Sequence, residues 1–118
     1  MDFTAAHLRY LLAIYELGRA APDVGAAEVA KVLHVSRPSV TRMLALLMDR
    51  GLLVRERYGK IYLTDSGFLL AKEFQRKTQA LCARIPAMGL SLTEEELLDT
   101  ACLLAGSLPR HVFEKPEK

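Results

Sequence analysis

Polar and cationic side chains gather at the start of one predicted helix, over residues 36–42. Ser36 is a typical helix N-cap, and Pro38 suits the first helical turn, so a helix is expected to begin here. Side chains in the first turns of such a helix can bond to base edges and phosphates when the helix lies in the major groove of DNA. The candidate DNA contacts on this helix are Ser36, Arg37, Pro38, Ser39, Thr41 and Arg42.

A basic hairpin is predicted directly after this helix. Residues 52–56 and 60–63 are typical of two short strands, joined by a turn at 57–59. Cations at that turn would lie near a phosphate backbone, although charged residues are also common at the solvated tip of an ordinary hairpin. We favour the phosphate contact, and the candidate residues are Arg55, Arg57, Tyr58 and Lys60.

Apolar residues at helical spacing predict the elements that position these side chains. Leu8, Leu11 and Tyr15 mark the buried face of a helix over residues 4–17, which Gly18 is expected to end. A second helix is predicted over residues 26–33, followed by a turn with His34 in the left-handed region, and the third helix reaches residue 50. Together with the hairpin, these helices predict a winged helix-turn-helix domain over residues 1–63.

Residues 64–118 are predicted to be helical. Thr64 caps a long helix over residues 65–85, and a capping box from Thr93 to Glu96 opens another helix that ends near residue 105. The predicted inward stripe of the long helix is Leu70, Phe74, Leu81 and Ile85, with Thr78 between them. Because these apolar faces are wider than one small domain can bury, pairing with a second copy is expected. The fold class is therefore mainly α, a winged helix-turn-helix followed by a helical dimerization domain.

Charge is distributed unevenly along the chain. The 118 residues have a net charge of +2, but residues 1–63 carry nine Lys/Arg against six Asp/Glu, whereas residues 64–118 carry seven against eight. A basic front half with a near-neutral back half suits a DNA-binding head on an assembly module, although a random scatter of charge would look similar.

Several classes of protein are not expected from this sequence. No apolar run suits a secretory signal or a membrane span, and Cys82 and Cys102 lack CxxC spacing, so we expect a cytoplasmic protein with reduced thiols and no membrane partner. Motifs for phosphate-binding loops, zinc hydrolases and serine nucleophiles are absent, so an enzyme is not expected.

Four segments of the chain share their order and wording with one protein family. They are residues 10–17 (YLLAIYEL), 35–44 (VSRPSVTRML), 52–54 (LLV) and 58–64 (YGKIYLT). They resemble the diphtheria-toxin-repressor family of metal-responsive repressors, and most of all its manganese-sensing branch. The resemblance implies a homodimer that binds an inverted repeat in double-stranded DNA, with divalent Mn or Fe favouring the DNA-binding arrangement.

The metal ligands that the resemblance implies are mostly lost. Residues that the family does not use as ligands occupy the ligand positions on the first, long and last helices: Arg9, Leu12, Thr78, Ala105 and Gly106. Cys102 is the one retained candidate ligand. One donor cannot hold a transition metal tightly, because such sites need several converging N, O or S atoms.

Three explanations of this loss stay open. In the first, Arg9 pairs with Asp99, one turn before Cys102, and supplies a fixed cation in place of the metal. In the second, apolar residues fill a decayed site, and DNA affinity is constitutive or controlled in another way. In the third, His7, Cys102 or His111 form a rebuilt metal site, although their spacing gives no reason for them to converge.

Arg37 is the residue that we expect to select a base, through a bidentate contact with guanine. Ser39, Thr41 and Arg42 suit contacts with the phosphate backbone. An alternative function is a dimeric adaptor that uses its winged helix to bind protein, although such a surface would tend to carry apolar or acidic residues in place of these. The sequence does not determine the operator, the regulated genes, the effector, or whether the protein represses or activates.

Overall fold

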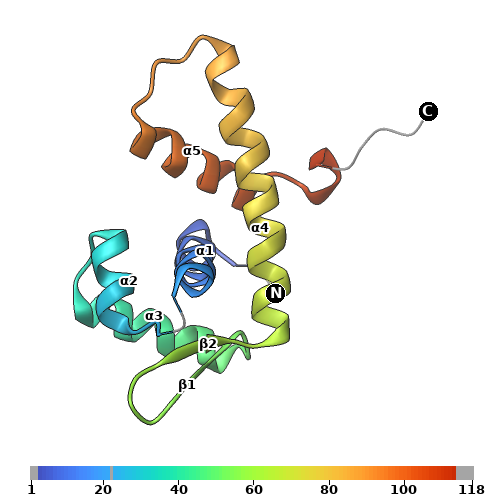
Figure 1. Ribbon diagram of the computed structural model, residues 1–118. Coiled ribbons are helices and arrows are strands. Elements are labelled where there is room, and N and C mark those ends of the chain that lie inside the picture. Colours follow the sequence, from blue (N-terminus) through green and yellow to red (C-terminus); the bar gives the residue numbers. More distant parts are fainter. Residues whose placement is uncertain (1–2, 22, 114–118) are drawn as a thin grey trace.

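The computed structural model describes residues 3–21 and 23–113, which form helices and one small hairpin (Figure 1). The helices are α1 (Ala5–Ala20), α2 (Ala26–Leu33), α3 (Arg37–Asp49), α4 (Asp65–Arg84) and α5 (Glu94–Ser107), with short 3-10 helices η1 (Ile85–Met88) and η2 (Arg110–Phe113). Strands β1 (Leu53–Arg55) and β2 (Ile61–Leu63) pair antiparallel, with Val54 opposite Tyr62. The predicted fold class is confirmed: the fold is mainly helical, with a winged helix-turn-helix followed by further helices.

Side-chain caps fix the helix starts where the sequence predicts them. At the starts of α1, α3, α4 and α5, a hydroxyl oxygen accepts a hydrogen bond from the backbone N–H three residues later, which satisfies a donor that the helix itself leaves free. The capping hydroxyls belong to Thr4, Ser36, Thr64 and Thr93. At the end of α2, His34 adopts the predicted left-handed conformation, with φ of 56°.

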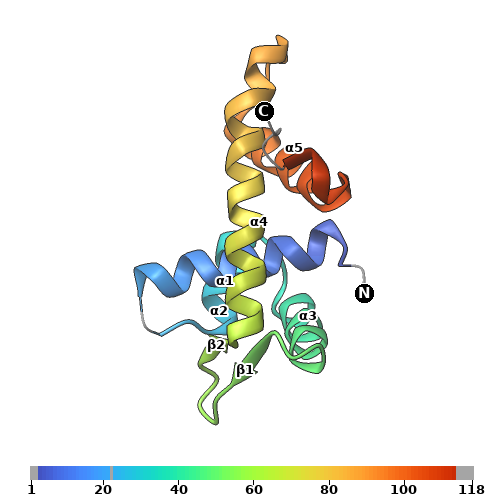
Figure 2. The same ribbon diagram turned by 90° about the vertical axis from the view of Figure 1, so that its right-hand side faces the viewer.

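The hydrophobic core is centred on α1. This helix packs against α2, α3, β2, α4 and α5, and it lies between the α2–α3 pair and α4 (Figures 1 and 2). Its residues from Tyr10 to Tyr15 are all buried. Among the described residues, the large side chains that are almost fully enclosed are Leu11, Ile14, Val29, Val40, Leu44, Leu47 and Leu53.

One prediction about helix geometry is wrong, and another is incomplete. Gly18 does not end the first helix, which continues to Ala20: Gly18 is exposed, and the Ala21 N–H still bonds to the Leu17 carbonyl. In the predicted stripe of the long helix, Phe74, Thr78 and Ile85 are buried, whereas Leu70 and Leu81 are half-buried against the core. The buried face of α4 also includes Gly67 and Ala71, whose small size lets the backbone of α4 approach its neighbours closely.

The start of α4 is seated on the segment that joins α3 to β1. The Thr64 hydroxyl donates to the Gly51 carbonyl at 2.7 Å, and the Thr64 N–H donates to the Leu52 carbonyl at 3.0 Å. A Cβ atom at Gly67 would lie 1.9 Å from the Leu52 carbonyl oxygen, so this contact requires glycine.

No helix within residues 3–21 and 23–113 has the length and apolar character needed to cross a membrane.

We predict that Gly67→Ala destabilises the protein by about 2–4 kcal/mol, because the new methyl group collides with backbone that cannot rotate away. The measurement is the free energy of unfolding in urea, followed by circular dichroism. Gly18→Ala is the matched control, since a Cβ there meets nothing within 4 Å, and it should stabilise by up to about 1 kcal/mol through helix propensity. Equal stability of Gly67→Ala and wild type would contradict the close approach.

Candidate nucleic-acid interface

The first turn of α3 presents polar groups to solvent while its opposite face is locked into the core. Val40, Leu44 and Leu47 are fully enclosed, which fixes the rotation of the helix about its axis. The predicted contact residues Ser36, Arg37, Pro38, Thr41 and Arg42 are exposed, and Ser39 is half-exposed. The structure therefore brings all six residues to one exposed face at the helix start.

Hydrogen bonds order part of this face. The Ser39 N–H donates to Ser36 Oγ at 3.2 Å, and the Ser36 hydroxyl donates to Ser39 Oγ at 2.9 Å. Arg42 Nη2 also donates to Ser39 Oγ, at 3.4 Å. Arg37 and Thr41 make no side-chain hydrogen bond or ion pair with any residue that the structure describes. Arg37 is thus a cation at the start of the helix with its donors available to a ligand.

The hairpin between α3 and α4 carries a second set of exposed groups. Arg55 and Arg57 are exposed, and 87% of the Tyr58 side chain is accessible at the hairpin tip. Gly59, with φ of 87°, allows the tight turn, in which the Glu56 N–H donates to the Lys60 carbonyl at 2.7 Å. This tip and α3 lie at the same end of the molecule, opposite α5 (Figures 1 and 2).

Lys60 differs from its predicted companions because it is already paired. Its Nζ lies 2.9 Å from Asp23 Oδ1, and the hydrogen bond and charge of Asp23 raise the pKa of Lys60. The Ile61 N–H also donates to the Val24 carbonyl at 2.8 Å, so the connector between α1 and α2 lies beside β2. The pairing of Lys60 with Asp23 could not be predicted from the sequence, since the two residues belong to separate predicted elements.

Arg9 and Asp99 are in contact, as the first of the three explanations of metal loss requires. The Arg9 guanidinium on α1 donates to the Asp99 carboxylate on α5 and forms an ion pair with it. The Arg9 side chain is 24% exposed, whereas that of Asp99 is 58% exposed. The contact joins the helix at the centre of the core to the last long helix. Its role in place of a metal stays a prediction.

The residues around this ion pair provide few donor atoms that could bind a metal ion. Cys102 and Thr78 are buried beside it, and the Thr78 hydroxyl, which lies next to the Cys102 thiol, has no oxygen or nitrogen partner within the described part of the chain. Burial raises the pKa of the Cys102 thiol, and the positive charge of Arg9 opposes that rise. A neutral thiol beside a fixed guanidinium is a poor ligand, because a metal needs the thiolate and is repelled by the cation.

No group of three or more His, Cys, Asp or Glu residues that could hold a metal ion occurs in residues 3–21 and 23–113. His7 instead belongs to the cap of α1, where its Nδ1 accepts a hydrogen bond from the Thr4 N–H at 3.2 Å. His7, Cys102 and His111 are therefore not gathered into a rebuilt site. The residues present do not fit the Mn or Fe ion that the family resemblance implies.

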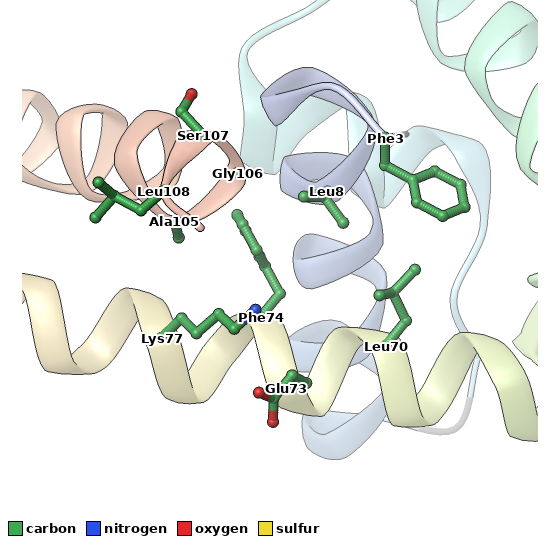
Figure 3. A pocket seen from close by; sticks show the side chains of 10 residues that line it. All are labelled: Phe3, Leu8, Leu70, Glu73, Phe74, Lys77, Ala105, Gly106, Ser107 and Leu108. Carbon is green, nitrogen blue, oxygen red and sulfur yellow. The ribbon is translucent and has the colours of Figure 1, made fainter. Parts of the chain in front are cut away.

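A groove of about 510 Å³ lies where α1, α4 and the end of α5 meet (Figure 3). Ala105 and Gly106, at two positions where the family resemblance implies ligands, line this groove near Leu8. A Cβ at Gly106 would lie 3.4 Å from the Ala5 Cα, so α5 and α1 are closely packed here. The acidic residue in the lining, Glu73, pairs with Arg76 on its own helix. At these two positions the groove therefore presents residues without a side-chain donor atom for a metal.

Known proteins resemble this chain over its first half or over most of its length. The model of the MarR family matches residues 1–59. Among solved structures, the chain is similar to the metal-dependent transcriptional regulator MtsR, with 25% identity and a TM-score of 0.77 over 90% of this chain and 49% of that one. It is also similar to the apo form of the manganese-activated repressor ScaR, with 30% identity and a TM-score of 0.65 over 88% of this chain and 49% of that one.

The chain thus spans about half the length of these two regulators. A hypothetical protein from Sulfolobus solfataricus, SSo2273, shares the fold over 93% of this chain and 83% of its own, with a TM-score of 0.67 and 14% identity. A comparison with curated proteins found no match. The relatives that share both fold and sequence are regulators of transcription and not enzymes, as expected.

We predict that iodoacetamide at pH 8 modifies Cys82 at least about tenfold faster than Cys102 in the folded protein. Burial raises the pKa of both thiols, but Cys102 is 3% exposed and Cys82 is half-buried. Peptide mass spectrometry of the wild-type protein measures both rates together. The two rates should converge in denaturant, and equal rates in the folded protein would show that the contact between α4 and α5 is open.

Proposed function

The chain belongs to the MarR family, and from this membership we propose that it is a homodimeric transcriptional repressor that binds an inverted repeat in DNA without a metal cofactor. The observation that supports this best is the exposed, polar and cationic start of α3, held in one orientation by a fully buried apolar back. A recognition helix needs this combination, because base contacts require side chains at fixed positions.

Specific contacts are proposed for the side chains that the fold leaves unpaired. Arg37 selects a base, since a guanidinium can donate two hydrogen bonds to guanine O6 and N7. Thr41 and the Ser36–Ser39–Arg42 group contact phosphates, and Pro38 offers an apolar contact to a thymine methyl group. The phosphate contacts set the position of α3 along the DNA, and the base contacts set the sequence preference.

The hairpin supplies phosphate contacts at the flank of the site. Arg55, Arg57 and Tyr58 are exposed at its tip, and none of them has a side-chain partner within the described residues. Lys60 acts differently, because its pairing with Asp23 holds the hairpin against the connector beside α2. Wing cations of this kind add affinity without base preference, and their contribution falls as salt rises.

Dimerization is proposed for residues 64–118, which continue from the DNA-binding part at 1–63. Large apolar side chains are exposed along α4, η1, the following connector and α5: Phe68, Leu69, Met88, Leu90, Leu92 and Leu103. An apolar surface of this kind suits contact with another protein surface, and a two-fold axis would present two copies of α3 to two half-sites. An inverted repeat is the DNA counterpart of that symmetry.

Metal independence is proposed from the failed fit at the ligand positions. MtsR is metal-dependent and ScaR is manganese-activated, as their names state. In this chain, Arg9 takes up the Asp99 carboxylate and Cys102 is a buried thiol with a raised pKa. Neither the paired Asp99 carboxylate nor the buried Cys102 thiol suits Mn²⁺ or Fe²⁺, because these ions prefer several converging oxygen or nitrogen donors.

We predict that Arg37→Ala loses about 1–3 kcal/mol of binding free energy for its preferred operator and relaxes preference at one base of each half-site. Arg42→Ala should weaken all sequences alike and lower the salt dependence by about one phosphate contact. The experiment selects operators from a randomised DNA library with the wild-type protein and then titrates each variant against the selected site.

Arg84→Ala is the matched control, because Arg84 is an exposed arginine at the far end of α4. An unchanged base preference in Arg37→Ala would remove its role in direct readout. Failure of the wild-type protein to select any sequence, together with capture of a protein partner by α3, would instead support the adaptor function. Sedimentation on the selected operator should show two chains for each inverted repeat.

A further inference from the structure

We propose that the Arg9 guanidinium is a built-in cation that holds α1 against α5 and so keeps the DNA-binding helices and the helical arm (α4, η1 and α5) in one arrangement. The proposal rests on the proposed function, and it makes Arg9 and Asp99 positioning residues for DNA binding. MtsR is metal-dependent and ScaR is manganese-activated; in this chain the cation between α1 and α5 is a side chain, which cannot dissociate. DNA binding then has no metal switch.

The position of Arg9 suits this role. On α1, it is the charged residue within a stretch from Leu8 to Tyr15 whose other members are all buried. α1 also packs against α2 and α3, so a change in the contact between α1 and α5 shifts the arm relative to the recognition helix. Within the part of the chain that the structure describes, the ion pair with Asp99 is the side-chain polar link between these two helices.

The chemistry of guanidinium suits a permanent link. Its charge persists at any pH that a protein meets, and its planar set of donors matches a carboxylate. A bound metal ion leaves when its concentration falls, whereas Arg9 remains. The same contact neutralises the Asp99 carboxylate, because the guanidinium supplies the positive charge that this group needs.

The surroundings of the ion pair are built for a closed site. Leu12, Thr78, Cys102 and Ala105 are each 3–5% exposed, and Gly106 is packed on Ala5. The buried Thr78 hydroxyl without an oxygen or nitrogen partner is the one polar group of this set left unsatisfied, and a lone hydroxyl is a weak metal ligand. These positions therefore carry small or apolar side chains, a neutral thiol and a hydroxyl, none of which needs an ion.

The magnitude of the link is set by its exposure. Because Asp99 is 58% exposed, solvent screens the pair, and pairs of this kind change an equilibrium by about two- to fivefold. We therefore expect Asp99→Asn to weaken operator binding by about two- to fivefold, with the same loss in Mn²⁺ and in chelator. Wild-type affinity should be equal in both conditions.

The experiment titrates the full chain on an operator selected with the wild-type protein, in EDTA and in MnCl₂. The variants are Arg9→Met, Asp99→Asn and the exchange Arg9→Asp with Asp99→Arg, which should recover most of the lost affinity. Glu95→Gln is the matched control, because it removes an exposed carboxylate from the same helix and should leave binding unchanged. A purely structural role would lower thermal stability without changing affinity for DNA.

Two results would overturn the proposal: an increase in wild-type affinity on addition of Mn²⁺, or an Asp99→Asn variant with wild-type affinity. Hydrogen exchange of the α5 amides gives a readout that needs no DNA. Exchange should be faster in Asp99→Asn than in wild type or Glu95→Gln, and indifferent to Mn²⁺ in all three. If the wild-type protein binds no DNA, the proposed function fails, while slower α5 exchange in Mn²⁺ would separately refute the internal cation.

Discussion

From Tyr10 to Tyr15 every side chain of α1 is buried, so this helix meets protein on all sides for more than a full turn. Most helices in small proteins bury only one stripe and leave the rest to water. Here α2, α3 and β2 pack on α1 as well as α4 and α5, and each is placed through its contact with the same helix. A charged residue next to such a buried stretch needs a partner, and Arg9 finds it in Asp99.

Much of the architecture could be predicted because its signals are local. Caps at Ser36, Thr64 and Thr93 depend on a hydroxyl and a backbone N–H three residues away, so sequence spacing is enough to find them. The end of α1 and the burial of Gly67 and Ala71 in α4 could not be predicted, because the role of a small residue depends on which neighbours pack against it. Nothing near Gly67 in the sequence shows that the Leu52 carbonyl will occupy the space of its missing side chain.

The candidate site also has a part that could be predicted from local sequence and a part that could not. The polar face of α3 was predictable, since one helix supplies both the polar residues and the apolar residues that orient them. The pairing of Lys60 with Asp23 was not, because it joins two segments whose relative position depends on the whole domain. The Arg9–Asp99 contact lies between these cases, because the resemblance to a known family placed both residues near one point before any geometry was available.

Most side chains on the exposed face of α3 contribute little to folding, so they can change while the fold is kept. Ser36 and Ser39 hold the helix start, but Arg37, Thr41 and Arg42 could be replaced without touching the enclosed residues Val40, Leu44 and Leu47. Thr64 and Gly67, which contact the residues that follow the other end of α3, fix the joint between α3, the hairpin and α4. Duplicated copies of this gene could thus drift to new DNA targets while inheriting an unaltered scaffold.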